Sequence, residues 1–268
     1  MTQTRLDPLD DPRDASPLRR SRRWSTRDAS VREWLDADDF DAAALRHNLR
    51  DIRRINGLLG WRPLAVRGVA RQVRAARLRA FSLLDVASGS ADIPAAIARW
   101  ASRANIAARI VATDLSPQIV AIAREACAGT HGLSIERQDA LALPYAAGSF
   151  DFALCTLALH HFAPDEAIRV LSEMARVSRR VLVYDAQRAR LAFLGVIVLT
   201  RVLRMSAMTC HDAPASVRRA YTARELRTLA AHAGLREVSV RVRVPYRLEL
   251  IASGGIASDA SPATGRAR

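Results

Sequence analysis

Short apolar runs alternate with segments of helical periodicity through the middle of the chain. The runs at residues 83–86, 106–112, 133–137, 150–155 and 181–185 have the length and composition of buried strands. Strands that alternate with helices predict a mostly parallel sheet covered on both faces. Two further runs, 239–244 and 247–252, flank Pro245-Tyr246 and predict an antiparallel hairpin that closes the sheet.

Two helical segments lie outside this alternation. The first covers residues 31–80, where apolar side chains recur at helical spacing: Trp34, Leu35, Phe40, Leu45, Leu49, Ile52 and Ile55. We expect either a lid over a ligand pocket or a helix packed on the sheet edge. The second, 188–220, holds an arginine-flanked apolar stretch well short of the ~20 residues that cross a bilayer. A pocket-lining helix, a helix resting on a membrane surface and a plain core helix all fit it.

The first strand ends in an acid and is followed by a turn of small residues. Asp85 precedes Ala87, Gly89 and Ala91, and a helix pattern begins directly afterwards. Such a turn lets backbone N–H groups approach a nucleotide-like ligand. The dinucleotide fingerprint would need a third glycine where Asp92 stands, so a bound diphosphate would meet a negative charge. We expect ordinary negative φ at both alanines and a slightly tighter pocket.

Acids also follow the next two strands. Asp114 ends the second strand, where an acid can accept hydrogen bonds from both ribose hydroxyls. Asp139 follows the third. A solvated strand end is the alternative for each of these acids taken alone.

Four ordered segments within residues 81–185 resemble the class I S-adenosylmethionine (SAM)-dependent methyltransferases, with alanine in place of glycine at two positions of the first motif. The L-H-H-F run at 159–162 is typical of quinone-biosynthesis enzymes, and 34–36, 49–56 and 216–222 resemble methyltransferases found beside type III polyketide synthases. The implied fold is α/β, a Rossmann-like seven-stranded mostly parallel sheet with an antiparallel terminal hairpin, plus an N-terminal helical lid. The implied cofactor is SAM. Its expected contacts are Asp85, Ala87, Gly89, Ala91, Asp114, Leu115, Asp139, Ala140 and Cys155.

The resemblance implies methyl transfer to a small lipophilic phenolic or quinone-like acceptor, with O-methylation as the expected reaction. C-methylation of a quinol ring and a noncatalytic SAM-fold partner of a biosynthetic enzyme stay open. His160 or His161 is the expected base, since an imidazole accepts protons near neutral pH. A helix cap or a packing role is the alternative for this pair. Weaker candidates to orient the acceptor are Tyr184, Asp185, His211 and Asp212.

Composition limits the remaining possibilities. All 41 basic residues are arginine and the net charge is +14, yet only 5% of residues are aromatic, so nucleic acid is not an expected partner. The three cysteines fit a reducing compartment, and no spacing typical of a metal site occurs. Residues 1–30 lack the apolar core of a signal peptide, so we expect a cytoplasmic domain over 81–252 between disordered tails at 1–30 and 253–268. Peripheral membrane contact and the oligomeric state stay open.

Overall fold

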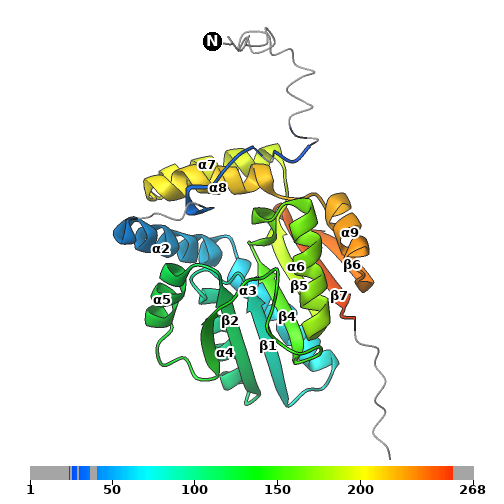
Figure 1. Cartoon of the computed structure of the whole chain (residues 1–268). Helices are drawn as coiled ribbons and strands as arrows, with labels where there is room; N and C mark the ends of the chain where they lie inside the picture. Colours follow the sequence, from blue (N-terminus) through cyan, green and yellow to red (C-terminus); the bar gives the residue numbers. More distant parts are fainter. Residues whose placement is uncertain (1–23, 25, 29, 37–40, 256–268) are drawn as a thin grey trace, which may run out of the picture.

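A seven-stranded sheet forms the centre of the molecule in the computed structural model, which describes residues 24, 26–28, 30–36 and 41–255 (Figure 1). Phe40 and nearly all of the expected tails lie outside these residues. The strand order is β3-β2-β1-β4-β5-β7-β6, with β7 antiparallel to both neighbours and the other pairs parallel. The strands are β1 (Ala80–Val86), β2 (Ala107–Asp114), β3 (Leu133–Arg137), β4 (Phe150–Thr156), β5 (Ser178–Ala186), β6 (Arg236–Arg243) and β7 (Arg247–Ser253). The predicted sheet and its closing hairpin are confirmed.

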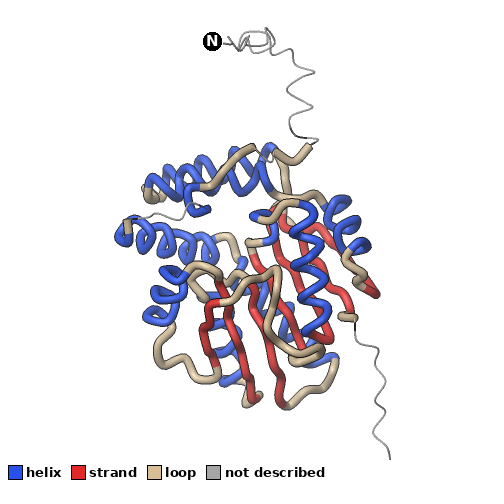
Figure 2. Tube along the Cα trace, viewed as in Figure 1, coloured by secondary structure: helices blue, strands red, loops and turns tan. Residues whose placement is uncertain are grey.

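Helices cover both faces of this sheet (Figure 2). They are α2 (Ala42–Leu58), α3 (Trp61–Ala75), α4 (Asp92–Arg103), α5 (Pro117–Ala126), α6 (Pro164–Val177), α7 (Arg190–Val202), α8 (Ala207–Arg219) and α9 (Ala223–His232), with short 3₁₀ turns η1 (Trp34–Asp36) and η2 (Leu159–His161). Successive side chains of β1 point to opposite faces, so Leu84 joins the core under α6 and α9, whereas Leu83 joins the core under α3 and α4. Each face therefore has its own apolar core.

The N-terminal extension meets the 188–220 segment beyond the carboxyl ends of the parallel strands. Helices α7 and α8 lie side by side there, with α2 next to them (Figure 1). Asp51 of α2 accepts hydrogen bonds from the Ser206 backbone N–H at 2.7 Å and the Thr209 hydroxyl at 3.2 Å, and both donors begin α8. The two segments therefore form one continuous roof over this end of the sheet, which we call the roof (η1, α2, α7 and α8).

Helix α3 approaches the sheet closely at one point. A Cβ atom on Gly68 would lie 1.7 Å from the Tyr184 hydroxyl oxygen, so only glycine fits. Tyr184 is fully buried by this contact, which gives it a packing role and removes it from the candidates for acceptor binding.

Candidate functional site

The turn after β1 follows a left-handed path at three positions. The φ angles of Ala87, Gly89 and Ala91 are 53°, 54° and 53°. The prediction of ordinary negative φ at the two alanines was therefore wrong: the turn keeps the glycine conformation even where alanine stands, at about 1–2 kcal/mol for each alanine. A Cβ atom on Gly89 would meet nothing within 4 Å. The turn is open where a ligand would approach it.

Asp114, at the end of β2, lies against this turn. Its Oδ2 accepts a hydrogen bond from the Gly89 backbone N–H at 2.9 Å, and its Oδ1 accepts from Ser116 N–H at 3.1 Å. Burial raises the pKa of the Asp114 carboxyl, although the two N–H donors oppose this shift. The neighbouring Leu115 side chain is 59% exposed and offers an apolar surface beside the carboxylate.

Asp85 is the most deeply buried acid of the turn. The Ser88 hydroxyl donates a short hydrogen bond to its Oδ2, whereas its Oδ1 is buried and accepts no hydrogen bond from the described residues. Burial raises the pKa of Asp85 to about 7, and the nearby Asp92 and Asp114 carboxylates add to that shift. A buried carboxylate oxygen without a donor fits a cationic ligand group such as an ammonium.

Asp139, Ala140 and Cys155 occupy the neighbouring strand ends. The Asp139 side chain is exposed, and its Oδ1 accepts from the Leu141 backbone N–H at 2.8 Å. Ala140 is buried, as is Cys155, which pairs with Val86 across β1 and β4. Burial raises the pKa of the Cys155 thiol well above its ordinary range, so this residue can line a site but is poorly suited to act as a nucleophile.

Asp92 faces the N-terminal helices. Its Oδ2 accepts hydrogen bonds from Arg62 Nε at 3.1 Å and Nη2 at 3.0 Å, and its Oδ1 accepts from Asn56 Nδ2 at 3.0 Å. The charge that was expected to repel a diphosphate is therefore offset by Arg62. Sequence spacing gave no sign of this pairing, which ties α2 and α3 to the start of α4.

Replacing Asp92 with alanine should lower the free energy of unfolding by about 2–3 kcal/mol. Removing one partner of a buried ion pair typically costs ~3–5 kcal/mol, and Arg62 is partly exposed, which reduces this value. Urea unfolding would measure the change. The matched control is Glu125→Ala, which removes an exposed ion pair with Arg46 and should cost less than about 1 kcal/mol. Equal effects of the two variants would contradict the structural importance of the Asp92 contacts.

Two histidines follow β4 in the short turn η2. His160 is buried, and its Nδ1 lies 2.7 Å from Oδ1 of Asp185, whose Oδ2 accepts the His160 backbone N–H at 3.0 Å. His161 is partly exposed, and the two imidazole rings lie 4.5 Å apart. The structure also places Glu33 here, with a carboxylate oxygen 3.7 Å from Nε2 of each histidine. Glu33 was not predicted, because no sequence signal relates it to residues so distant along the chain.

His211 and Asp212 stabilise the roof. Asp212 accepts hydrogen bonds from the Trp34 and Leu35 backbone N–H groups at 2.7 and 3.1 Å, and the His211 ring stacks on Trp34 at 4.4 Å. These contacts hold η1 on α8. Both residues therefore have structural partners away from the β1 turn.

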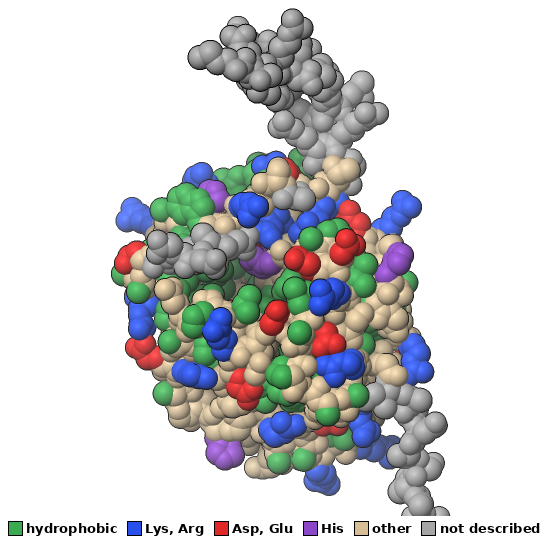
Figure 3. All heavy atoms as spheres, viewed as in Figure 1, with side chains coloured by type: hydrophobic (Ala, Val, Ile, Leu, Met, Phe, Trp, Pro, Cys, Tyr) green, Lys and Arg blue, Asp and Glu red, His purple; other side chains and the backbone are tan. Residues whose placement is uncertain are grey.

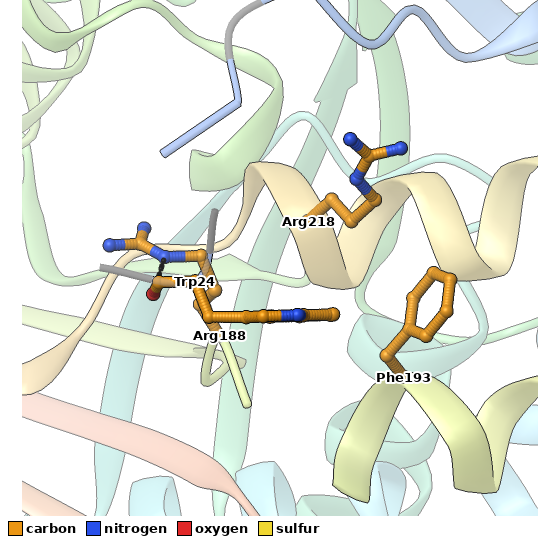
Figure 4. Close-up of a pocket in the computed structure, with 4 residues that line it drawn as sticks. All are labelled: Trp24, Arg188, Phe193 and Arg218. Carbon is orange, nitrogen blue, oxygen red and sulfur yellow. Dashed lines mark hydrogen bonds between the residues drawn. The ribbon is translucent and has the colours of Figure 1, made fainter. Parts of the chain in front are cut away.

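The surface is hollowed between the roof and the body of the molecule, and hydrophobic side chains gather around the hollow (Figure 3). A separate cavity of about 150 Å³ lies on the outer side of the roof, lined by Trp24, Arg188, Phe193 and Arg218 (Figure 4). Its two arginines are paired with Glu225 and Asp28. This small cavity is therefore a weak candidate for binding an anion.

The seven-stranded sheet with its antiparallel terminal hairpin is the arrangement that the resemblance to class I methyltransferases implied. Residues 83–180 match the family model described as a methyltransferase domain. The central part of the chain is therefore similar to a methyltransferase domain.

The chain is also similar to parts of two curated proteins. An uncharacterised protein of Mycobacterium tuberculosis is 42% identical over 102 residues, which is 37% of this chain and 33% of that protein. A demethylmenaquinone methyltransferase of Deinococcus radiodurans is 37% identical over 120 residues, 44% of each chain. The chain thus spans a third to under half of the curated relatives that it matches.

Among solved structures, a SAM-dependent methyltransferase from Aquifex aeolicus has a TM-score of 0.50 at 17% identity, covering 64% of this chain and 81% of that one. The methyltransferase SibL in its apo form has a TM-score of 0.51 at 20% identity, covering 74% and 57%. At these identities the likeness shows the fold. The predicted fold is confirmed, whereas the individual site residues stay predictions.

Proposed function

We propose that this protein transfers a methyl group from SAM to an oxygen of a small lipophilic phenolic or quinone-like acceptor. The observation that supports the proposal is the buried pair of His160 and Asp185 beside the β1 turn. A histidine held by a carboxylate at the carboxyl ends of β4 and β5 is suited to take a proton from an acceptor hydroxyl.

The residues of the β1 turn fit the cofactor. Asp85 offers a buried oxygen to a cationic group, Asp114 offers carboxylate oxygens to the ribose hydroxyls, and Leu115 offers an apolar side chain beside them. When bound, SAM supplies an electrophilic methyl group on a sulfonium. The protein then needs to align the acceptor and to assist the loss of its proton.

Asp185 fixes how His160 can act. Its two oxygens hold the ring Nδ1 and the backbone N–H of the same residue, which orients the imidazole. With the proton on Nδ1, the Nε2 lone pair is the one that can accept a proton from the acceptor hydroxyl. His161 is the second candidate for the base. Its ring is more exposed than that of His160, and its Nε2 lies 3.7 Å from the Glu33 carboxylate, which also lies 3.7 Å from Nε2 of His160.

Replacing His160 with glutamine should lower kcat about a hundredfold, the usual size of a general-base contribution, while SAM binding changes little. The assay would follow methyl transfer to alkylresorcinols, naphthols and quinols. His232→Gln is the matched control, since His232 is exposed at the end of α9. Unchanged kcat in His160→Gln would remove His160 as the base.

The same assay separates the alternative functions. SAM binding without methyl transfer to any acceptor would favour a noncatalytic partner, and a methylated ring carbon would favour C-methylation.

Helix α7 presents an exposed apolar face that would suit a membrane surface, where a lipophilic acceptor would partition. Of its described side chains only Thr200 is buried, and Leu191, Leu194, Val198 and Val202 are more than half exposed along one face. Across the described part of the chain, none of the helices combines the length and apolar character that a membrane crossing requires. The exposed face of α7, next to Arg190, Arg201 and Arg204, would suit contact with an anionic membrane surface.

The double variant Leu194→Glu/Val198→Glu should abolish binding to vesicles that contain phosphatidylserine, because it places charges on the apolar face. Vesicle co-sedimentation would measure this loss, expected to be about tenfold or more in partitioning. Arg227→Glu/Arg236→Glu changes charge on the α9 side and serves as a control. If the unmodified protein stays in the supernatant, the membrane contact is wrong.

A further inference from the structure

Three metal-ligating side chains converge at the carboxyl end of β4. One ligand atom each from Glu33, His160 and His161 lies within 4.8 Å of the other two. The Glu33 carboxylate reaches both rings, since Oε1 is 3.7 Å from Nε2 of His160 and Oε2 is 3.7 Å from Nε2 of His161. Two imidazoles and a carboxylate are a ligand set that zinc and related divalent ions prefer.

The Nε2 atom of His160 is a second and independent observation. His160 is 2% exposed, and this nitrogen takes part in no hydrogen bond with any residue that the structure describes. A buried imidazole nitrogen normally finds a partner, because leaving it without one costs free energy. Its position toward Glu33 and His161 is the one that a shared ion would satisfy.

Asp185 supports His160 in the way that outer carboxylates support metal-binding histidines. Its Oδ1 lies 2.7 Å from Nδ1, on the opposite side of the ring from Nε2. Such a contact fixes the Nδ1–H tautomer and leaves Nε2 as the free ligand.

Glu33 is held in place by the roof. The backbone N–H groups of the next two residues, Trp34 and Leu35, donate to Asp212 of α8. On the other side of Glu33, Arg27 Nη2 donates to the backbone oxygen of His160 at 2.7 Å. The carboxylate is therefore fixed over the histidine pair by contacts on both sides of it.

The local charge allows a cation. Glu33 and Asp185 carry two negative charges, and Arg219 lies 3.7 Å from Glu33 Oε1 while donating to the His161 backbone oxygen at 2.6 Å. Arg219 offsets part of the negative charge and lowers the expected affinity. Arg27, whose Nη2 lies 2.7 Å from the His160 backbone oxygen, offsets the rest. The attraction for a divalent ion would therefore come from the three ligand atoms themselves and not from a net negative charge.

We propose that Glu33, His160 and His161 bind one divalent transition-metal ion of the zinc type. Metal–ligand distances of about 2.0–2.2 Å place the ligand atoms of a tetrahedral ion about 3.3–3.6 Å apart. Atoms that lie up to 4.8 Å apart must therefore approach by up to roughly an ångström, through rotation of their side chains. The expectation from sequence spacing that no metal site exists did not consider Glu33, which only the folded chain brings to the histidines.

The metal site goes beyond the proposed function. Both use the same atom, Nε2 of His160, and the two roles exclude one another there. The His160 lone pair cannot hold a proton and a metal ion together. Three protein ligands leave a coordination position open, so an acceptor hydroxyl could bind the ion there and release its proton to water more readily than the free phenol does.

Titration with Co²⁺, followed by its visible absorption bands, would test the site on the untagged, chelator-treated full chain. We expect one ion bound per chain, with displacement by Zn²⁺. Glu33→Gln and His161→Ala should each weaken Co²⁺ binding about 10–100-fold or more, and Asp185→Asn about tenfold or more. His232→Ala, which changes an exposed histidine on α9, should leave binding unchanged.

Circular dichroism melting would show that each variant folds, and His161→Ala is the safest because its side chain is a quarter exposed. Absence of Co²⁺ binding, or equal binding by His161→Ala and the unmodified chain, would overturn the proposal. SAM titration of the same samples separates the two ideas. A chain that binds SAM but no metal refutes only the metal site, and a chain that binds metal but no SAM refutes only the proposed function. A chain that binds both supports the metal site and removes His160 as the base, while methyl transfer from SAM stands.

Discussion

Replacing Asp114 with alanine should weaken SAM binding by about 10²–10⁴-fold. Hydrogen bonds to a charged group contribute about 1.5–3 kcal/mol each, and the carboxylate is expected to accept two from the ribose hydroxyls. The same side chain also holds the turn, because it accepts the Gly89 backbone N–H. Isothermal titration with SAM and S-adenosylhomocysteine would measure the loss.

Two variants separate the ligand contact from the support of the turn. Asp114→Asn keeps an oxygen that can accept from Gly89 N–H but removes the charge and one acceptor, so its loss should lie between those of the unmodified chain and Asp114→Ala. Asp165→Ala changes an exposed acid at the start of α6 and should bind SAM normally. If Asp114→Ala bound SAM as tightly as the control, the ribose assignment would be wrong.

The central strands β1, β4 and β5 could be predicted because they are buried on both faces, which gives continuous apolar runs such as residues 150–155. The capping box between Thr222 and Glu225 at the start of α9 is likewise a local feature, since it depends on residues three apart. The left-handed backbone conformation at Ala87 and Ala91 could not be predicted from the sequence. The fold imposes positive φ there against the preference of alanine, and no local pattern records this conflict.

The contacts made by the N-terminal extension could not be predicted from the sequence either. Glu33 reaches the histidines, and Arg62 reaches Asp92, only because the roof packs over the strand ends. Periodicity predicts which side of a helix is apolar, but it does not give the partner of a polar side chain far along the chain. The positions of the acids at the strand ends could be predicted, because parallel strands place their carboxyl ends at one edge of the sheet.

Asp85→Asn should make the SAM-free protein more stable at pH 8 and leave its stability near that of the unmodified chain at about pH 4. The pKa of Asp85 is about 7 in the folded protein and near its ordinary value of 3.8 in the unfolded chain. Between these values the unfolded chain has lost a proton that the folded protein keeps, so the free energy of unfolding falls as pH rises. At about 1.4 kcal/mol per pKa unit the full difference is at most about 4 kcal/mol, reached above pH 7.

Urea unfolding of both proteins across this pH range would give the difference directly, and comparing them cancels the other titrating groups. Asp92 and Asp114 contribute to the raised pKa, so Ser116→Ala, which leaves these charges in place, is the matched control. A constant difference between Asp85→Asn and the unmodified chain at all pH values would show that folding does not raise the pKa of Asp85. A cationic ligand beside Asp85 favours the charged form of this carboxyl. At pH 8 the unmodified chain should therefore gain more stability from saturating SAM than Asp85→Asn does, and the difference between the two proteins should shrink. The buried carboxylate that lowers the stability of the SAM-free protein would then be the group that binds the cofactor.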